Sequence, residues 1–522
     1  MSYRVCIATA GTGSRLGDLT RFINKSLVGI ANRPILSYLI EQFPVDAEFV
    51  IALGHKGHLV REFVELAYPE RQFFFAEVDP FDGPGSGLGL SLLACKQYLQ
   101  QPFVFISCDT LVKEPIPAPV ENWMGFSEVA GLQPYRSLAI HDEQVSAICE
   151  KGVGKDDAHK AYIGLAGIQD YRSFWAAMQS GGPEAIETGE AHGMRALLPR
   201  SIKAYFFTWY DTGNLSALAR ARANYQELDT PNILEKANEA IWFVDNQVIK
   251  FSDNQEFIAN RVKRVNELQG FVPDVTGAST HMYRYTKVQG KIMSEVVTLP
   301  LFEQLLEQCN LFWTKKTLTS IGVSAFNTTC KKFYRDKTFE RIALFYKNFD
   351  REDRTESING LSMQKLDTLL NAINWSWLAN GLPGRFHGDF HFENILWNAK
   401  DERFTFLDWR QDFAGDISTG DIYYDFAKLL HGLIICHELI AKDLYKVEWS
   451  TDEIFFDFHR KQVLVECEQR FGEWLKKEGY DHKKVLVLTA LIFLNIAALH
   501  HSPYSLLLFS LGKLMLKKEL EK

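Results

Sequence analysis

Short apolar runs alternate with longer amphipathic stretches at the start of the chain, and this alternation restricts the fold more than any other feature. The runs 5–9, 48–52 and 103–107 have the length of strands, and the stretches 34–42, 59–67 and 88–98 have helical spacing. Strands that alternate with helices favour a mostly parallel sheet with helices on both faces. We therefore expect the chain to begin with an α/β domain.

The chain is too long for one hydrophobic core. It has 522 residues, whereas single cores stop growing at about 250–300 residues. The α/β pattern ends near Tyr225, and the polar, proline-containing segment 227–232 suits a connection between domains. We expect a first domain over 1–230 and a second over 236–522.

The second domain is predicted to have two lobes and an α+β fold. Two apolar runs, 241–244 and 247–251, flank the dipeptide Asp245-Asn246, as in a β-hairpin. After Pro300 the chain is strongly helical except between Gly384 and Asp408. This pattern predicts a small β-rich lobe over about 236–296 and a helical lobe over about 297–522.

Composition excludes several classes of protein. The net charge of −8, from 57 basic and 65 acidic residues, provides no basic surface for nucleic acid. The eight cysteines occur singly, which disfavours a zinc ribbon or redox dithiol and fits a reducing compartment. The longest apolar stretch, 485–499, is shorter than the roughly 20 residues of a membrane span. We expect a cytoplasmic protein with small-molecule partners, without nucleic acid or membrane insertion, and the sequence leaves open whether it forms a homo-oligomer.

A glycine-rich segment, 11–15 (GTGSR), directly follows the first predicted strand, and Lys25 follows within the same connection. Gly11 and Gly13 let the backbone approach a phosphate chain closely, and Arg15 and Lys25 can neutralise its charge. A tight strand-to-helix turn with solvated cations explains this motif equally well when it is taken alone.

Further motifs follow in an order that resembles the sugar-phosphate nucleotidylyltransferase family. They are 83–88 (GPGSGL), 107–109 (SCD), 150–151 (EK), 162–164 (YIG) and 209–213 (WYDTG). The resemblance extends from about Tyr3 to Tyr225 and implies a Rossmann-like nucleotidyltransferase fold. It also implies transfer of a nucleotide from a nucleoside triphosphate to a sugar phosphate, with release of pyrophosphate.

The resemblance assigns four residues to the chemistry of this first site. Asp109 and Asp211 hold Mg²⁺ across the triphosphate, since hard cations take oxygen ligands. Arg15 stabilises charge on the departing phosphates, and Lys25 orients the attacking phosphate, so both are catalytic by positioning and electrostatics. A simple turn residue is the alternative for Asp211.

The remaining residues of this site are expected to bind substrates. Gly11, Gly13 and Gly87 contact the nucleotide in the resemblance. Glu150 accepts hydrogen bonds from sugar hydroxyls, and Lys151 binds the sugar phosphate. An ordinary exposed loop lysine is the alternative for Lys151, because the residues that follow it are polar.

A second motif, 386–396 (FHGDFHFENIL), is followed by the apolar run 404–407, which ends at Asp408. The pattern closely resembles the aminoglycoside phosphotransferase and choline kinase family, over about Ala240 to the C-terminus. The resemblance makes Asp389 the catalytic base for an attacking hydroxyl. It makes Asn394 and Asp408 the ligands of Mg²⁺ on the ATP phosphates.

Other residues of the second half have supporting roles in this resemblance. Lys250, in the run 247–250, contacts the nucleotide phosphates, with Glu256 favoured over Glu267 as its helix partner. Asp425 braces the catalytic loop. His387 and His391 are structural supports, and neither is expected to bind a transition metal.

Together the two resemblances predict a bifunctional enzyme. The C-terminal kinase phosphorylates a small hydroxylated metabolite, with a sugar favoured, using ATP and Mg²⁺. The N-terminal half couples the phosphate to a second NTP, with CTP or UTP favoured, for surface polysaccharide or glycan synthesis. Choline or another amino alcohol, giving a CDP-linked product, is the first alternative. A nucleotide-sensing protein with one inactive half is the second.

Overall fold

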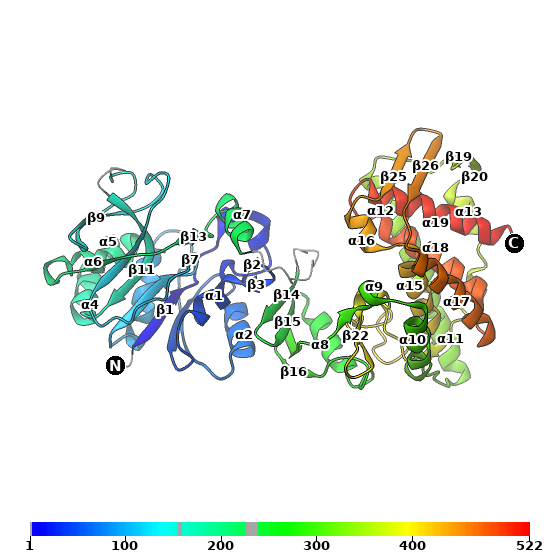
Figure 1. The fold of residues 1–522 in the computed structure, drawn as a ribbon, viewed down its shortest axis with the longest axis horizontal. Helices are drawn as coiled ribbons and strands as arrows, with labels where there is room; N and C mark the ends of the chain where they lie inside the picture. Colours follow the sequence, from blue (N-terminus) through cyan, green and yellow to red (C-terminus); the bar gives the residue numbers. More distant parts are fainter. Residues whose placement is uncertain (1–2, 155–158, 226–237) are drawn as a thin grey trace. The chain divides into compact units, whose positions relative to one another are not determined.

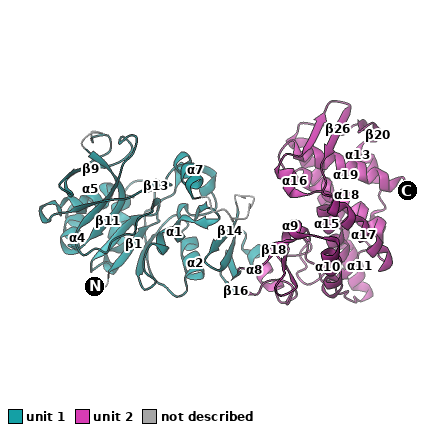
Figure 2. Ribbon diagram, in the orientation of Figure 1, with its two compact units in different colours: residues 1–258, 276–286 teal, residues 259–275, 287–522 magenta. Residues whose placement is uncertain are grey.

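The computed structural model describes residues 3–154, 159–225 and 238–522. The chain divides into two compact units: Met1–Ile258 with Thr276–Thr286, and Ala259–Val275 with Lys287–Lys522 (Figure 2). We describe each unit by itself. The connection predicted over 227–232, and the end of the first domain at 230, lie outside the described residues, so this boundary stays a prediction.

Unit 1 is built on a nine-stranded sheet (Figure 1). Its strands, in spatial order, are β5 (Gln72–Glu77), β4 (Glu48–Leu53), β1 (Arg4–Ala8), β6 (Phe103–Ser107), β11 (His159–Ile168), β8 (Trp123–Ser127), β12 (Lys203–Phe206), β10 (Gln144–Cys149) and β9 (Ser137–His141). From β5 to β6 the neighbours are parallel, but β11 runs antiparallel to both β6 and β8. The sheet is therefore mixed rather than mostly parallel, since hairpin-type connections such as the one between β9 and β10 replace helical crossovers in its second half.

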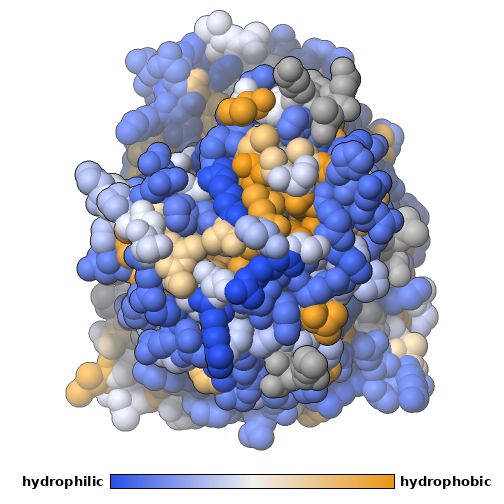
Figure 3. All heavy atoms as spheres, turned by 90° about the vertical axis from the view of Figure 1, so that its left-hand side faces the viewer, coloured by the Kyte–Doolittle hydropathy of each residue, from blue (hydrophilic) through white to orange (hydrophobic). Residues whose placement is uncertain are grey.

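Helices cover both faces of this sheet, as predicted. The helices are α1 (Ile35–Glu41), α2 (Gly57–Ala67), α3 (Leu88–Cys95), α4 (Tyr171–Ser180), α5 (Gly182–Thr188), α6 (Glu190–Arg195) and α7 (Leu215–Asn224). Neighbouring residues of β1 enter different cores: Ile7 packs in the cluster that contains Phe63 of α2, and Cys6 in the cluster that contains Leu92 of α3. This alternation is the period of two that a strand imposes. On the face of unit 1 drawn in Figure 3, apolar side chains gather in one hollow surrounded by hydrophilic ones.

The order of the parallel strands indicates at which edge of the sheet a ligand would bind. The chain passes from β1 to β4 and β5 and then returns to β6 on the other side of β1. Ligands of such sheets bind where the strand order reverses, beyond the carboxyl ends of the strands. Gly11 follows β1 and Asp109 follows β6, so both lie at this edge.

A second sheet belongs to the same compact unit. It consists of β14 (Glu239–Val244), β15 (Gln247–Ser252), β17 (Met282–Thr286) and β16 (Val275–Ala278), in that order. The predicted hairpin is present, and Asp245 adopts the positive φ of 50° that its turn requires. Trp242 of β14 packs edge-to-face on Phe63 of α2, with 5.3 Å between ring centroids. This packing joins the second sheet to the first domain.

Unit 2 is mostly helical (Figure 1). Its main helices are α10 (Leu299–Phe312), α11 (Ser320–Lys331), α12 (Lys337–Asn348), α15 (Ile422–Ile434), α17 (Gln462–Lys477), α18 (His482–Ala497) and α19 (Tyr504–Leu520). Helix α18 packs against α12, α15 and α19, which explains the long apolar run in its sequence. Among the described helices none is long and apolar enough to cross a membrane.

Unit 2 also has two sheets of three and four strands, besides the short pair of β21 (Pro383–Gly384) and β24 (Gly420–Asp421). The first, β18 (Lys291–Ile292), β22 (Ile395–Asn398) and β23 (Arg403–Phe406), contains the strands predicted between Gly384 and Asp408. The second, β20 (Leu361–Met363), β19 (Glu356–Ile358), β26 (Glu453–Phe458) and β25 (Tyr445–Trp449), interrupts the region predicted to be helical. The helical prediction was wrong there, because β25 and β26 alternate buried or half-buried residues with exposed ones, which is a strand period.

Candidate active sites

The first candidate site surrounds Gly213. A Cβ atom built on this glycine would lie 3.1 Å from Oδ2 of Asp109, 3.1 Å from Oδ1 of Asp211 and 3.2 Å from Nη2 of Arg15. The structure therefore brings together the two predicted metal ligands and the predicted catalytic arginine. Converging carboxylate oxygens are the ligands that Mg²⁺ prefers, so these residues fit the cation.

Backbone pairing holds the two aspartates together. Strand β7 (Thr110–Val112) pairs antiparallel with β13 (Trp209–Asp211), which places Asp211 opposite Thr110. The Thr212 amide donates to the Asp109 carbonyl at 3.0 Å. The hydroxyl of Tyr135, a residue that the sequence motifs did not indicate, donates to Oδ2 of Asp211 at 3.3 Å.

Lys25 is the immediate partner of Asp109. Its Nζ lies 3.3 Å from Oδ2 of Asp109. Burial alone would raise the pKa of Asp109, but the charges of Lys25 and Arg15 hold it below its usual value. Burial would lower the pKa of Lys25, but the negative charge of Asp109 outweighs this effect and raises the pKa above its usual value. The pair is ionised at neutral pH, so the carboxylate is available as a ligand.

Asn24 fixes the loop that carries Lys25. Its buried side chain accepts hydrogen bonds from the amide and hydroxyl of Ser26 at 2.9 and 2.8 Å, and donates to the carbonyls of Thr9 and His55 at 3.0 and 2.6 Å. Gly13 is required beside it, because its φ is 68° and a Cβ would lie 2.8 Å from the Cβ of Lys25. A buried asparagine directly before the lysine was the signal that motif reading missed.

The other predicted binding residues have mixed surroundings. Glu150 accepts from Nε of Arg136 at 3.0 Å and forms an ion pair with Arg195, so two arginines already satisfy it. Lys151 is exposed in the turn that follows. A Cβ on Gly87 would collide with the carbonyl oxygen of Ile186 in α5, so close packing against α5 by itself requires a glycine here. Gly11 lies nearer the chemistry, since its Cβ position is 4.0 Å from Cε of Lys25.

The second candidate site lies on the loop between β21 (Pro383–Gly384) and β22 in unit 2. Asp425 of α15 accepts hydrogen bonds from the amides of His387 and Gly388 at 2.6 and 2.7 Å, and from Nε1 of Trp313 at 3.1 Å. Burial raises the pKa of Asp425 to about 6 against these hydrogen bonds. This is the bracing contact that the sequence predicted for Asp425.

Asp389 projects from this loop among polar partners. Its carboxylate lies 2.7 Å from Nζ of Lys428, 3.5 Å from Nε2 of His391 and 3.3 Å from Nδ2 of Asn394. Burial would raise its pKa, but Lys428 and His391 hold it well below the usual range. Motif reading missed Lys428, although it lies three residues after Asp425 in one helix and therefore on the same face.

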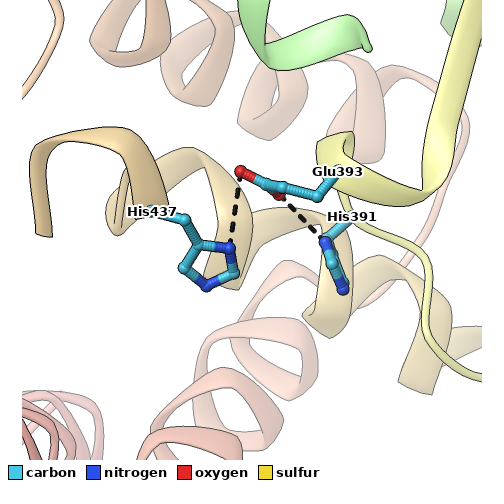
Figure 4. A group of neighbouring side chains, drawn as sticks. All are labelled: His391, Glu393 and His437. Carbon is cyan, nitrogen blue, oxygen red and sulfur yellow. Dashed lines mark hydrogen bonds and ion pairs between the residues drawn. The ribbon is translucent and has the colours of Figure 1, made fainter. Parts of the chain in front are cut away.

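Glu393 lies between His391 and His437 (Figure 4). Nδ1 of His391 lies 3.0 Å from Oε2 of Glu393, whose other oxygen lies 3.4 Å from Nδ1 of His437. Burial opposes protonation, but Asp389 and Glu393 raise the pKa of His391 to about 9. The side chains of His391, Glu393 and His437 are close enough together to bind a metal ion, with one possible ligand atom of each within 4.8 Å of the others. Through Nε2 of His391, which lies 3.5 Å from Oδ2 of Asp389, this group also positions the predicted base.

The predicted metal ligands of the kinase site are adjacent. The amide nitrogen of Asn394 faces Asp389, which leaves its oxygen as the ligand atom. The Leu407 amide donates to the Asn394 carbonyl at 2.7 Å and so places Asp408 beside it. Oδ1 of Asp408 lies 2.6 Å from Nη1 of Arg261. An amide oxygen and a carboxylate fit Mg²⁺.

Of the remaining predicted kinase residues, Lys250 and Glu256 belong to unit 1 and Glu267 belongs to unit 2. Lys250 is buried in β15, paired with Ile241 and Tyr283, and belongs to unit 1. Glu256 is exposed at the start of α8 (Gln255–Arg264), and Glu267 pairs with Lys316 at 3.3 Å.

Comparison with known proteins finds similarity over parts of the chain. Residues 333–444 match the sequence model of the phosphotransferase enzyme family. The nucleotidyltransferase Agl11 of low-salt glycan biosynthesis, from Haloferax volcanii, is 30% identical over 159 residues, which are 28% of this chain and 43% of that protein. Residues 333–444 thus resemble phosphotransferases, and a further stretch of the chain is homologous to a nucleotidyltransferase, of which the chain spans less than half the length.

Solved structures are similar at lower identity. A UDP-glucose pyrophosphorylase in complex with UDP-glucose is 16% identical, with a TM-score of 0.38, and covers 43% of this chain and 98% of its own. A CTP:phosphocholine cytidylyltransferase from Streptococcus pneumoniae is 14% identical, with a TM-score of 0.34. The match covers 43% of this chain and 100% of that chain.

Proposed function

We propose that this chain is a bifunctional enzyme that phosphorylates a small hydroxylated metabolite and then activates the product with a nucleotide. The observation that carries the proposal is that each unit has its own cluster of carboxylates, around Gly213 in unit 1 and around Asp389 in unit 2. In each cluster a lysine of the same unit pairs with a carboxylate: Lys25 with Asp109, and Lys428 with Asp389.

In the kinase half, Asp389 accepts the proton of the acceptor hydroxyl while that oxygen attacks the γ-phosphorus of ATP. Lys428 and His391 keep the carboxylate ionised and oriented. Mg²⁺, bound by Asn394 and Asp408, would neutralise charge on the phosphates. Lys250 would contact the nucleotide phosphates. The products are the phosphorylated metabolite and ADP.

In the nucleotidyltransferase half, a phosphate oxygen of that metabolite attacks the α-phosphorus of a second NTP, with CTP or UTP favoured. Lys25 orients the attacking phosphate and Arg15 stabilises the departing pyrophosphate by charge. Gly11, Gly13 and Gly87 would contact the nucleotide through their backbone, and Glu150 and Lys151 would contact the sugar phosphate. Asp109 and Asp211 would hold Mg²⁺, which would neutralise charge on the phosphates.

A sugar is the favoured metabolite, and the activated product would serve glycan or surface-polysaccharide synthesis. The named role of the Haloferax relative in glycan biosynthesis supports this choice. We propose a cytoplasmic location because ATP and the second NTP are supplied there. An amino alcohol such as choline is the second candidate, supported by the motif of the C-terminal half.

The test measures both half-reactions in the full chain. Sugars and amino alcohols are offered with Mg·ATP while ADP release is followed, and the four NTPs are then offered with each phosphorylated product while pyrophosphate is followed. We expect one acceptor class to support both reactions in sequence. Binding of nucleotide without either reaction would contradict the proposal and support a sensing protein.

A further inference from the structure

A cavity of about 520 Å³ opens in unit 2 next to the kinase loop. Its wall includes Phe333, Lys337, Glu340 and Arg341 from the helical segment around α12, and Arg410 and Asp412 from the loop after Asp408. None of the roles assigned above uses this cavity.

Three cations dominate its wall. Lys337, Arg341 and Arg410 are half-buried, and within the part of the chain that the structure describes no carboxylate forms an ion pair with any of them. Lys337 and Arg410 instead lie over the ring of Phe333, at 4.5 and 5.0 Å from its centroid. The Nε atom of Arg410 is buried without a hydrogen-bond partner.

The two acids of the wall do not balance these charges. Glu340 is exposed, at the outer side of its helix. Asp412 is half-buried and accepts the Gly415 amide at 3.0 Å. Burial lowers the pKa of Lys337, and the neighbouring charges of Arg410, Lys428 and Arg341 lower it further. The cavity is therefore a site of uncompensated positive charge.

Intermediate residues connect the cavity wall to the loop and helix around Asp389. The Arg410 amide donates to the His387 carbonyl at 2.9 Å, directly before Gly388 and Asp389. The ring of Tyr424 lies 6.0 Å from Nζ of Lys337. Tyr424 precedes Lys428 by one helical turn in α15, and Lys428 lies 2.7 Å from Asp389. A continuous row of side chains thus leads from Asp389 to the cavity.

We propose that this cavity is the acceptor subsite of the kinase and that it takes a hydroxylated metabolite carrying a carboxylate or phosphate, such as a sugar acid or a sugar phosphate. The inference rests on the proposed kinase function. Lys337, Arg341 and Arg410 bind the anionic group by charge-assisted hydrogen bonds, and the hydroxyl faces Asp389. The hydroxyl oxygen bonds to the γ-phosphorus, the bond to ADP breaks, and the proton passes to Asp389. A cationic amino alcohol is disfavoured by repulsion.

Binding to the full chain, with Mg²⁺ and a non-hydrolysable ATP analogue present, tests the charge preference. The probes are D-glucuronate, D-glucose 6-phosphate, neutral D-glucose and choline, followed by calorimetry. We expect at least one anion to bind about tenfold or more tighter than glucose, as one charge-assisted contact provides. The tighter of the two anions distinguishes a carboxylate from a phosphate ligand. Glucose or choline binding as tightly as both anions, or no binding of either anion, would overturn the inference.

Variants assign the effect to this cavity. Lys337→Gln and Arg341→Gln should each weaken anion binding about tenfold and leave glucose binding and ATP-analogue affinity unchanged. Lys332→Gln, an exposed lysine nearby in the same helical segment, is the matched control. Unchanged anion affinity in both cavity variants would refute the assignment. Turnover is measured separately: an active kinase that prefers neutral acceptors would keep the proposed function and overturn only this inference.

Discussion

Glu62 and His281 are joined by a hydrogen bond of 2.9 Å between Oε1 and Nδ1, although one lies on α2 and the other precedes β17. The second oxygen of Glu62 accepts the Ser279 hydroxyl at 2.7 Å and the His281 amide at 2.9 Å. Arg284 adds a hydrogen bond to the Leu66 carbonyl. The sheet that carries Lys250 is therefore bound to the rest of unit 1 by polar contacts as well as by Trp242.

Replacing Glu62 by Gln should destabilise unit 1. Hydrogen bonds to a charged group contribute about 1.5–3 kcal/mol, and the variant keeps the shape but loses the charge, so we expect a loss of about 1–2 kcal/mol. Denaturant unfolding measures it. Glu65→Gln, exposed on the same helix, should change the unfolding free energy by less than about 0.5 kcal/mol. Equal effects of the two variants would contradict the role of Glu62.

The stabilisation by Glu62 should depend on pH. Burial would raise the pKa of Glu62, but hydrogen bonds from His281 and Ser279 lower it below its usual value. The unfolded chain therefore binds this proton at higher pH than the folded chain does. The difference in unfolding free energy between the wild type and Glu62→Gln should be full above the usual glutamate pKa and fall as pH drops through the lowered value. A difference that grows on acidification would refute this.

Fragments 1–225 and 238–522 should stay associated when they are co-expressed. The β14–β17 sheet belongs to the second fragment, yet Trp242 shares a core with Phe63 and Val64 of the first. Pull-down of a tagged fragment 1–225 measures the association. We expect Trp242→Ala to weaken it by about 3–5 kcal/mol, the usual cost of a buried tryptophan. Two independently soluble, non-interacting fragments would show instead that the small sheet folds with the rest of the kinase.

Asp109→Asn should stop pyrophosphate release and spare the kinase. The change removes a carboxylate next to Arg15 and Lys25, and we expect a loss of at least about 10²-fold in nucleotidyl transfer. ATP-dependent phosphorylation should be unaltered. The two half-reactions are measured on one preparation, and parallel loss of both in a folded variant would mean that the two-site assignment is wrong.

Asp389 and Asp408 should respond differently to substitution. Asp389→Asn should lower kinase turnover about 10²–10⁴-fold with nearly unchanged ATP affinity, since a base acts as the reaction proceeds. Asp408→Ala should weaken Mg·ATP binding as well as turnover. Kinetics and Mg·ATP titration separate the two roles. Full activity of the first variant, or unaltered metal binding in the second, would rule out the corresponding role.

The sequence predicted those parts of the molecule whose signals are local. Strands such as β1 and the glycine loop after it depend on neighbours in the chain, and motif order placed Asp109 and Asp211 together. It missed β5, whose run Phe73-Phe74-Phe75 has no alternation, and the sheet of β25 and β26. Contacts such as Lys428 with Asp389, or Glu62 with His281, depend on tertiary packing between distant segments, which no local pattern encodes.

The glycine at the meeting point of Asp109, Asp211 and Arg15 has an evolutionary consequence. Gly213 has no functional group, yet a methyl group added there would approach two carboxylate oxygens and a guanidinium more closely than ordinary van der Waals contact, at 3.1–3.2 Å. A substitution would therefore fill the volume that a cation or phosphate needs, while leaving every charged residue in place. A homologue that keeps both aspartates but has a larger residue at this position should have lost nucleotidyl transfer, so the residue to inspect for silent inactivation is the one without a side chain.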